Sequence, residues 1–261
     1  MRHRTIVAGF AGALALPALA IPGAAQADEV SGDIRITKVV VNGGNNIVLG
    51  TTGVKTFTIA VTATDDSGIE VGRTFPVMWH RPLPNGDYYG LVVPDDIAGK
   101  CVRESFTTTT CTYTLEINPR IDLDNTTAGT WTVGAHALAN DGDYITKDSA
   151  AKAKVLRNSR LTVNASPEPV KKNKTITVTG ALTPANWETY KYGGYTKQPV
   201  KLQFKKKGTS TYKTPKTVAT DSKGNLRTTT KATADGYFRY SFAGTSTTPA
   251  VASAADYVDV K

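Results

Sequence analysis

An alternation of apolar and polar residues with a period of two restricts the fold of this chain more than any other feature, and it recurs from residue 28 onward. Clear runs span residues 57–63, 131–137 and 200–204. Turn-forming residues bound such runs, as in Asn140-Asp141-Gly142 and Ala234-Asp235-Gly236. Because successive side chains of a strand point to opposite sides, this pattern indicates strands with one buried face.

No stretch after residue 27 carries an apolar stripe at helical spacing, and Thr and Val are abundant where helices favour Leu, Glu and Ala. Residues 28–261 are long enough for two ordinary domains. Roughly seven short strands per hundred or so residues, with turns between them, are typical of immunoglobulin-like sandwiches. The sequence therefore predicts an all-β protein of two tandem immunoglobulin-like β-sandwich domains, with a small β-barrel as the alternative.

Charge divides these residues into two parts. Residues 28–157 hold 12 basic and 16 acidic side chains, a net charge of −4, whereas residues 158–261 hold 17 basic and 6 acidic side chains, a net charge of +11. The alternating pattern also restarts at Leu161, directly after the run that ends near Val155. We therefore predict an acidic sandwich over residues 28–157 and a basic sandwich over residues 158–261. A short connection is expected, because no Pro/Gly-rich linker separates them.

The first 27 residues have the layout of a secretory signal peptide. Arg2 and Arg4 precede an uncharged apolar stretch, which small residues close at Ala25-Gln26-Ala27. A membrane anchor is the competing interpretation, but the acidic Asp28 directly after this A-x-A site favours cleavage. We therefore expect a signal peptide over residues 1–27, a secreted extracellular protein and no membrane insertion after cleavage.

The chain has two cysteines, Cys101 and Cys111, and their use agrees with an oxidising compartment. Neither belongs to a C-x-x-C pair, and their spacing suits a disulfide that closes a hairpin. We predict this disulfide, with a stabilisation of about 2.5 to 3 kcal/mol from chain entropy. Two free thiols and a shared metal are the alternatives. Zinc is disfavoured, because no histidine or further cysteine lies nearby.

Groups that exchange protons near neutral pH are scarce after residue 27, where His80 and His136 are the only histidines. Each lies in a predicted strand whose apolar neighbours take the other parity, so both are expected to face solvent. The sequence has no G-x-S-x-G elbow, H-E-x-x-H helix or phosphate-binding glycine loop. We predict that the protein is not an enzyme. Hydrolysis by a carboxylate pair stays open, because such pairs need no local motif.

Calcium is the more promising ligand, because it prefers several oxygen donors and the acidic half carries aspartates in its predicted loops. These loops hold Asp65-Asp66, Asp95-Asp96, the Asp122 and Asp124 pair, and the Asp141 and Asp143 pair. The candidate metal ligands are Asp122, Asp124, Asp141 and Asp143. An EF-hand is excluded, since a loop beginning at Asp122 would place Thr127 at the position of its glycine. Ordinary turn formation by Asp and Asn is the alternative interpretation.

Aromatic residues crowd one predicted loop of the basic half. The candidate binding residues of this loop are Trp187, Tyr190, Lys191, Tyr192, Tyr195 and Lys197. Such rings provide platforms for sugars and for protein contacts, and the net charge of this half favours anionic partners. We expect an anionic cell-wall polymer or polysaccharide as the partner, and no nucleic acid because of the predicted compartment. The alternative is that the loop folds back and caps the end of its own sandwich.

Three motifs stand out in the basic half: the Pro167-Glu168-Pro169 entry before a Lys-rich turn, the turn at Gly224-Asn225, and the stretch Gly236-Tyr237-Phe238-Arg239-Tyr240. With them, residues 159–261 resemble, nearly end to end, a bacterial immunoglobulin-like domain at the C-terminus of small secreted two-domain proteins of actinobacteria. Residues 28–157 are similar in outline to the N-terminal half of the same proteins. Proteins of this group are often labelled calcium-binding, so the resemblance implies calcium binding for this chain.

Together these features predict a secreted, non-catalytic binding or adhesion protein that binds calcium and associates with anionic cell-wall or polysaccharide surfaces. One alternative is a structural or self-assembling extracellular protein that associates through its strand edges. Another is an inhibitor that presents the loop between Cys101 and Cys111, with Arg103 as a constrained bait.

Overall fold

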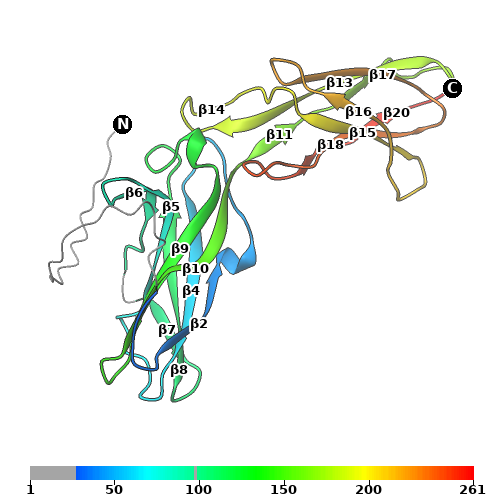
Figure 1. Cartoon of the computed structure of the whole chain (residues 1–261). Coiled ribbons are helices and arrows are strands. Elements are labelled where there is room, and N and C mark those ends of the chain that lie inside the picture. The colour runs from blue at the N-terminus through cyan, green and yellow to red at the C-terminus, as the bar shows by residue number, and fades with distance from the viewer. Residues whose placement is uncertain (1–27, 97–98) are drawn as a thin grey trace.

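The computed structural model describes residues 28–96 and 99–261, so the predicted signal peptide over residues 1–27 lies outside the described residues. The described residues form twenty strands and two short 3-10 helices. They are arranged as two β-sandwiches, which follow one another along the chain and meet at an angle (Figure 1). The expected all-β class is confirmed.

The first sandwich, which we call the acidic domain, comprises the described residues up to Arg157. Its strands are β1 (Glu29–Ser31), β2 (Arg35–Val41), β3 (Ile47–Leu49), β4 (Lys55–Thr64), β5 (Phe75–Pro82), β6 (Tyr88–Val92), β7 (Lys100–Arg103), β8 (Thr108–Ile117), β9 (Gly129–Leu138) and β10 (Tyr144–Arg157), and its 3-10 helices are η1 (Asn42–Gly44) and η2 (Asn125–Thr127). One sheet has the order β2-β4-β8-β7 and the other the order β1-β10-β9-β5-β6, with β3 parallel to β10. With β2, β4, β5, β7, β8, β9 and β10 labelled A to G in chain order, the first sheet has the order A-B-E-D and the second contains G-F-C. This is the immunoglobulin arrangement.

The second sandwich, which we call the basic domain, follows Asn158. Its strands are β11 (Ser159–Leu161), β12 (Asn164–Ser166), β13 (Thr175–Asn186), β14 (Lys191–Tyr192), β15 (Pro199–Lys206), β16 (Lys213–Ala219), β17 (Asn225–Lys231), β18 (Gly236–Phe242), β19 (Val251–Ala252) and β20 (Asp256–Val258). In one sheet β13 pairs with β11, β12, β14 and β17; the other has the order β16-β15-β18, with β19 and β20 both beside β18. Two facing antiparallel sheets again give an immunoglobulin-like sandwich.

Each sandwich has its own hydrophobic core, and the alternation in the sequence builds both. On β4 the apolar positions Phe57 and Ile59 are buried, and Trp131 on β9 is fully buried. In the basic domain Tyr240 on β18 is fully buried, and its hydroxyl donates to the carbonyl oxygen of Val178 at 3.0 Å. This bond satisfies the polar tip of a core side chain. The predicted strands with one buried face are therefore confirmed in these segments.

The predicted disulfide is confirmed and closes the β7–β8 hairpin. Cys101 on β7 lies directly opposite Cys111 on β8, and the two sulfur atoms are bonded. Arg103 follows on β7 and is exposed, with its guanidinium carbon 5.7 Å from the centre of the Phe106 ring. The bridge therefore ties an edge strand to its neighbour beside a short exposed turn.

The acidic domain has two ends with different neighbours (Figure 1). At one end, which we call the free end, β2 and β10 begin and β4 ends. At the other end, which we call the joint, β10 ends and the basic domain begins. There the backbone N–H of Asn158 donates to the Leu49 carbonyl at 2.7 Å, and the Asn158 carbonyl accepts from the Ala185 N–H at 2.7 Å. Loops of the free end therefore lie far from the basic domain.

Candidate functional site

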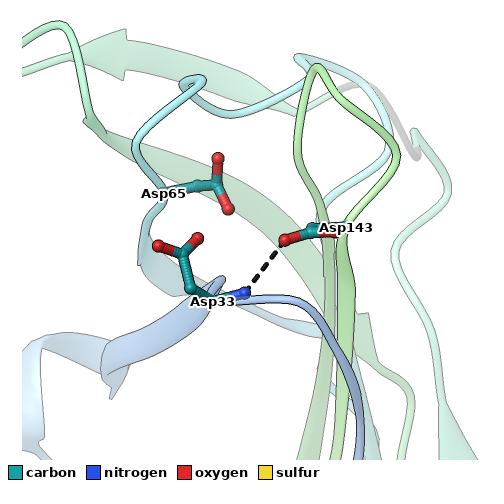
Figure 2. Close-up of side chains that lie close together, drawn as sticks. All are labelled: Asp33, Asp65 and Asp143. Carbon is teal, nitrogen blue, oxygen red and sulfur yellow. Dashed lines mark hydrogen bonds between the residues drawn. The ribbon is translucent and has the colours of Figure 1, made fainter.

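Three aspartates converge at the free end of the acidic domain. Asp33 lies just before β2 and Asp65 just after β4, and the antiparallel register of these strands, with Arg35 opposite Thr64, places them at the same edge. Asp143 lies just before β10. One carboxylate oxygen from each aspartate lies within 4.8 Å of the others. Figure 2 shows the three side chains turned toward one another.

Asp65 is the buried member of this cluster, with only 3% of its surface exposed. Its Oδ1 accepts hydrogen bonds from the backbone N–H of Ser67 at 2.8 Å and from the Ser67 hydroxyl at 2.6 Å. Its Oδ2 is buried and has no hydrogen-bond donor among the described residues. Burying a carboxylate oxygen without a partner is costly, so this atom has the environment of a ligand for a positive group.

Asp143 is held in place by the chain segment that leads into β2. Its Oδ2 accepts a hydrogen bond from the backbone N–H of Asp33 at 2.9 Å (Figure 2), and its own N–H donates to Oδ1 of Asp141 at 3.1 Å. Gly32 makes this approach possible: its φ is +80°, and a Cβ atom there would overlap the Asp143 carboxylate. Glycine is the residue that combines this backbone conformation with so close a contact.

A second group of three carboxylates overlaps the first, because Asp65 also lies within 4.8 Å of Asp66 and Asp141. The crowding of negative charge affects Asp33. Partial desolvation and then the charges of Asp66 and Asp65 raise the pKa of Asp33 above its ordinary value. Like charges at this distance disfavour ionisation, and a cation placed among them would reverse that effect.

The four predicted metal ligands therefore separate into two pairs. Asp141 and Asp143 lie in the free-end cluster, whereas Asp122 and Asp124 lie at the opposite end of the domain, in the loop after β8. Asp65 lies in one of the predicted acidic loops but was not among the four predicted metal ligands, and Asp33 was not predicted at all. The signal for both lies in strand pairing, since a residue before one strand and a residue after its antiparallel neighbour share an edge.

Asp122 and Asp124 are engaged in ordinary turn and cap interactions. Oδ2 of Asp122 accepts from the Asn118 N–H at 2.7 Å. Asp124 is the N-cap of η2, where its Oδ1 accepts from the N–H groups of Thr126 and Thr127 at 2.8 and 3.2 Å. The Tyr89 hydroxyl donates to the other oxygen of Asp124. This is capping chemistry of the kind expected for Asp before a helical turn.

The predicted aromatic binding loop forms part of the joint. Trp187 is 1% exposed and packs into the core of the acidic domain. Its backbone N–H donates to Oδ1 of Asn125 at 3.1 Å, and its Nε1 donates to the Gly50 carbonyl at 2.8 Å. The ring is therefore covered by the neighbouring domain and is not accessible to a ligand in this arrangement. The alternative interpretation expected the loop to cap its own sandwich, whereas Trp187 also covers the end of the neighbouring acidic domain.

Two tyrosines of this loop pack against different domains. Tyr192 packs against the acidic core, and the Arg160 guanidinium lies 3.7 Å from its ring centre. Tyr195 packs on its own sandwich, where its ring centre lies 5.9 Å from that of Phe242. Both rings are half-buried. They therefore share the structural role of Trp187 more than that of an open platform.

Three residues of the loop keep exposed side chains. Tyr190 is 40% exposed, with the Arg120 guanidinium carbon 5.2 Å from its ring centre. Lys191 and Lys197 are also exposed. Of the six candidate binding residues, these three are the ones that a partner at the joint would reach.

The two histidines differ from the expectation of solvent-facing strand residues. Both are half-buried. Burial, followed by the charge of Arg81, lowers the pKa of His80, and burial, followed by Arg73, lowers the pKa of His136. Nδ1 of His136 lies 2.9 Å from the Thr146 hydroxyl. His136 has the predicted outward parity but is partly covered by the Phe75 ring. For His80 the predicted parity is wrong, because it shares the face of buried Met78 and lies beside the buried Trp131 ring.

No helix within residues 28–96 and 99–261 is long and apolar enough to cross a membrane.

Comparison with known sequences gives one family. Residues 49–137, which lie within the acidic domain and make up less than half of the chain, match a family of unknown function (DUF5707). No curated protein matches the chain at a significant level. The matched segment includes Asp65 but neither Asp33 nor Asp143.

Several solved structures share a general likeness. Fibronectin(III)-like modules of Clostridium thermocellum CbhA align with 13% identity and a TM-score of 0.32, over 85% of this chain and 93% of that one. The D0-D1 domain of intimin aligns with 14% identity and a TM-score of 0.28, over 85% of this chain and 98% of that one. A chimeric titin Z1Z2 aligns with 11% identity and a TM-score of 0.26, over 90% of this chain and 99% of that one. At TM-scores this low, no conclusion about this chain rests on them.

Proposed function

We propose that this chain is a non-catalytic extracellular binding or adhesion protein whose acidic domain binds calcium at its free end. One observation carries the calcium proposal. Asp65 is almost fully buried, its Oδ2 has no donor among the described residues, and it faces the carboxylates of Asp33 and Asp143. A bound cation supplies the missing partner and removes the repulsion among the three groups.

Calcium fits this donor set better than the other common cations. All the available ligands are carboxylate oxygens, which suit hard cations rather than zinc or copper. The three groups come from separate chain segments at an exposed loop edge, and calcium tolerates such irregular, partly hydrated geometry, whereas magnesium demands a near-ideal octahedron. We expect an affinity in the range of extracellular calcium modules, with Kd on the order of 10⁻⁴ to 10⁻³ M.

The extracellular placement is supported by the disulfide between Cys101 and Cys111, since such bonds persist in oxidising compartments. The layout of residues 1–27 as a signal peptide agrees with it. The resemblance to secreted two-domain proteins of actinobacteria, a group often labelled calcium-binding, points the same way.

A non-catalytic role is supported by what surrounds the titratable groups. His80 and His136 are half-buried beside aromatic rings, and burial, followed by the charge of a neighbouring arginine, lowers the pKa of each imidazole despite the opposing charges of Asp124 and Glu29. The net charge of +11 on residues 158–261 supports an anionic cell-wall or polysaccharide partner for the basic domain.

The calcium proposal is tested by calorimetric titration and by thermal unfolding of the signal-free protein. With Kd near 10⁻⁴ M, about 5 mM calcium stabilises the folded state by about 2 kcal/mol. This corresponds to an increase in the Tm of the acidic domain of about 7 °C. Magnesium at the same concentration is expected to have a much smaller effect.

Asp65→Asn is the decisive variant, because its amide still accepts from Ser67 and offers a donor where Oδ2 has none. It is expected to fold normally and to lose the calcium response. Asp87→Asn, in the loop between β5 and β6 at the joint end, is the matched control with the same change of charge. An unchanged Tm and no heat with wild-type protein, or an equal response in both variants, would refute the proposal.

A further inference from the structure

A second group of aromatic and basic side chains lies on the outer face of the basic domain, away from the joint. We call it the tyrosine face, and it consists of Lys205, Lys207, Tyr212, Tyr237, Arg239 and Tyr257. The register across β15, β18 and β20 builds it, since Lys205 lies opposite Tyr237 and Tyr237 opposite Tyr257. The alternate residues Phe238 and Tyr240 point into the core. The tyrosine face therefore belongs to the solvent side of the sheet.

Rings and cations alternate across this face in contact distance. Nζ of Lys205 lies 5.2 Å from the centre of the Tyr212 ring and 5.0 Å from that of Tyr237. The Arg239 guanidinium carbon lies 3.7 Å from the centre of the Tyr212 ring. Tyr237 and Tyr257 contact one another, with ring centres 5.2 Å apart. Cation–π contacts of this kind hold long basic side chains in defined positions.

The positive charges of the tyrosine face are only partly neutralised. Lys207 forms an ion pair with Asp235, with Nζ and Oδ2 3.8 Å apart. Arg239 uses Nε to donate to Oε1 of Gln203 at 2.8 Å, and neither it nor Lys205 contacts a carboxylate among the described residues. Rings fix these two cations while leaving their charge uncompensated. A surface of this kind is preorganised for an anion.

We propose that the tyrosine face binds a carboxylated polysaccharide. The cations supply charge complementarity to the carboxylates, and the half-exposed edges and faces of three tyrosines suit pyranose rings, which present apolar C–H faces. A polyol phosphate has the charge but lacks such rings. Nucleic acid has the charge and carries flat base rings that stack on tyrosines, but the oxidising compartment indicated by the disulfide disfavours it. The inference rests on the anionic-surface part of the proposed function and is independent of the calcium site.

Polygalacturonate in EDTA is the probe, and calorimetry at low salt is the measurement. The double variant Lys205→Gln, Arg239→Gln is expected to bind at least tenfold more weakly than wild type. Arg227→Gln, Lys231→Gln is the matched control, because it removes the same charge from β17 in the opposite sheet, where both side chains are exposed. It is expected to change affinity less than about threefold, as a loss of general field only.

Further ligands separate the chemistries. Neutral dextran keeps the pyranose ring without the carboxylate, and poly(glycerol phosphate) and single-stranded DNA carry charge on other scaffolds. Preference for polygalacturonate over all three, lost in the tyrosine-face variant, supports the proposal. Equal losses in both double variants, no binding, or equal binding of poly(glycerol phosphate) or DNA would overturn it. Because EDTA is present throughout, a failure of the calcium proposal would leave this result unaffected.

Discussion

Replacing Trp187 with alanine is expected to destabilise the acidic domain, although the residue belongs to the basic one. The ring is 1% exposed and packs into the acidic core, and its Nε1 donates to the Gly50 carbonyl at 2.8 Å. Truncating a buried Trp to Ala costs about 3 to 5 kcal/mol. We expect the lower end, about 3 kcal/mol, because water can enter a joint between domains more easily than a closed core.

The assay uses the intrinsic fluorescence of the variant. After Trp187→Ala the remaining tryptophans, Trp79 and Trp131, both lie in the acidic domain, so fluorescence reports that domain alone. With a urea m-value of about 2 kcal/mol/M, the midpoint is expected to fall by about 1.5 M. Trp187→Phe keeps a ring and loses the bond to Gly50, with an expected cost of about 1 to 2 kcal/mol. Tyr190→Ala, at an exposed position, is expected to cost less than about 0.5 kcal/mol.

If the fluorescence midpoint of Trp187→Ala stays within about 0.3 M of wild type, the ring does not stabilise the acidic domain. The joint would then be a loose contact between independent domains.

Three further outcomes follow from the acidic domain. In EDTA near neutral pH, Asp33→Asn is expected to raise the Tm, because the raised pKa of Asp33 means that its ionised form destabilises the calcium-free fold. In the wild-type protein the same destabilisation disappears as the pH falls and Asp33 is protonated. In calcium, Asp33→Asn is expected to lose the increase in Tm that calcium gives the wild-type protein. Reducing the Cys101–Cys111 disulfide is expected to lower stability by about 2.5 to 3 kcal/mol, measured by urea unfolding with and without reductant; no change would show that the hairpin is held without it. Because the pKa values of His80 and His136 are lowered in the folded state, stability is expected to fall as pH drops through about 6.5, and His136→Gln should flatten that profile in thermal scans; an unchanged slope would contradict it.

The strands were readable from the sequence because burial on one face of a sheet leaves a local signature. The alternation at Phe57 and Ile59, and again at Trp131, reports side chains that are buried in the structure. The disulfide was readable for a similar reason, since two cysteines ten residues apart have few other partners.

Only part of the candidate site could be predicted from the sequence, because the rest depends on strand register. Asp141 and Asp143 lie in one loop, but Asp33 and Asp65 reach them only through pairing of β2 with β4 and of β1 with β10. The burial of Trp187 against the acidic domain could not be predicted from the sequence. Its Nε1 bonds to a carbonyl 137 residues away, and sequence shows that an aromatic residue needs cover without showing which domain supplies it.

A crystal structure of residues 28–261 grown with calcium, with terbium as an anomalous substitute, would locate the cation directly. We expect a peak at the free end with oxygen ligands from Asp33, Asp65 and Asp143 at about 2.3 to 2.6 Å. Oδ2 of Asp65 should be among the coordinating atoms, since it has no donor among the described residues. A cation bound only at Asp122 and Asp124, or none between the three carboxylates at millimolar calcium, would contradict it.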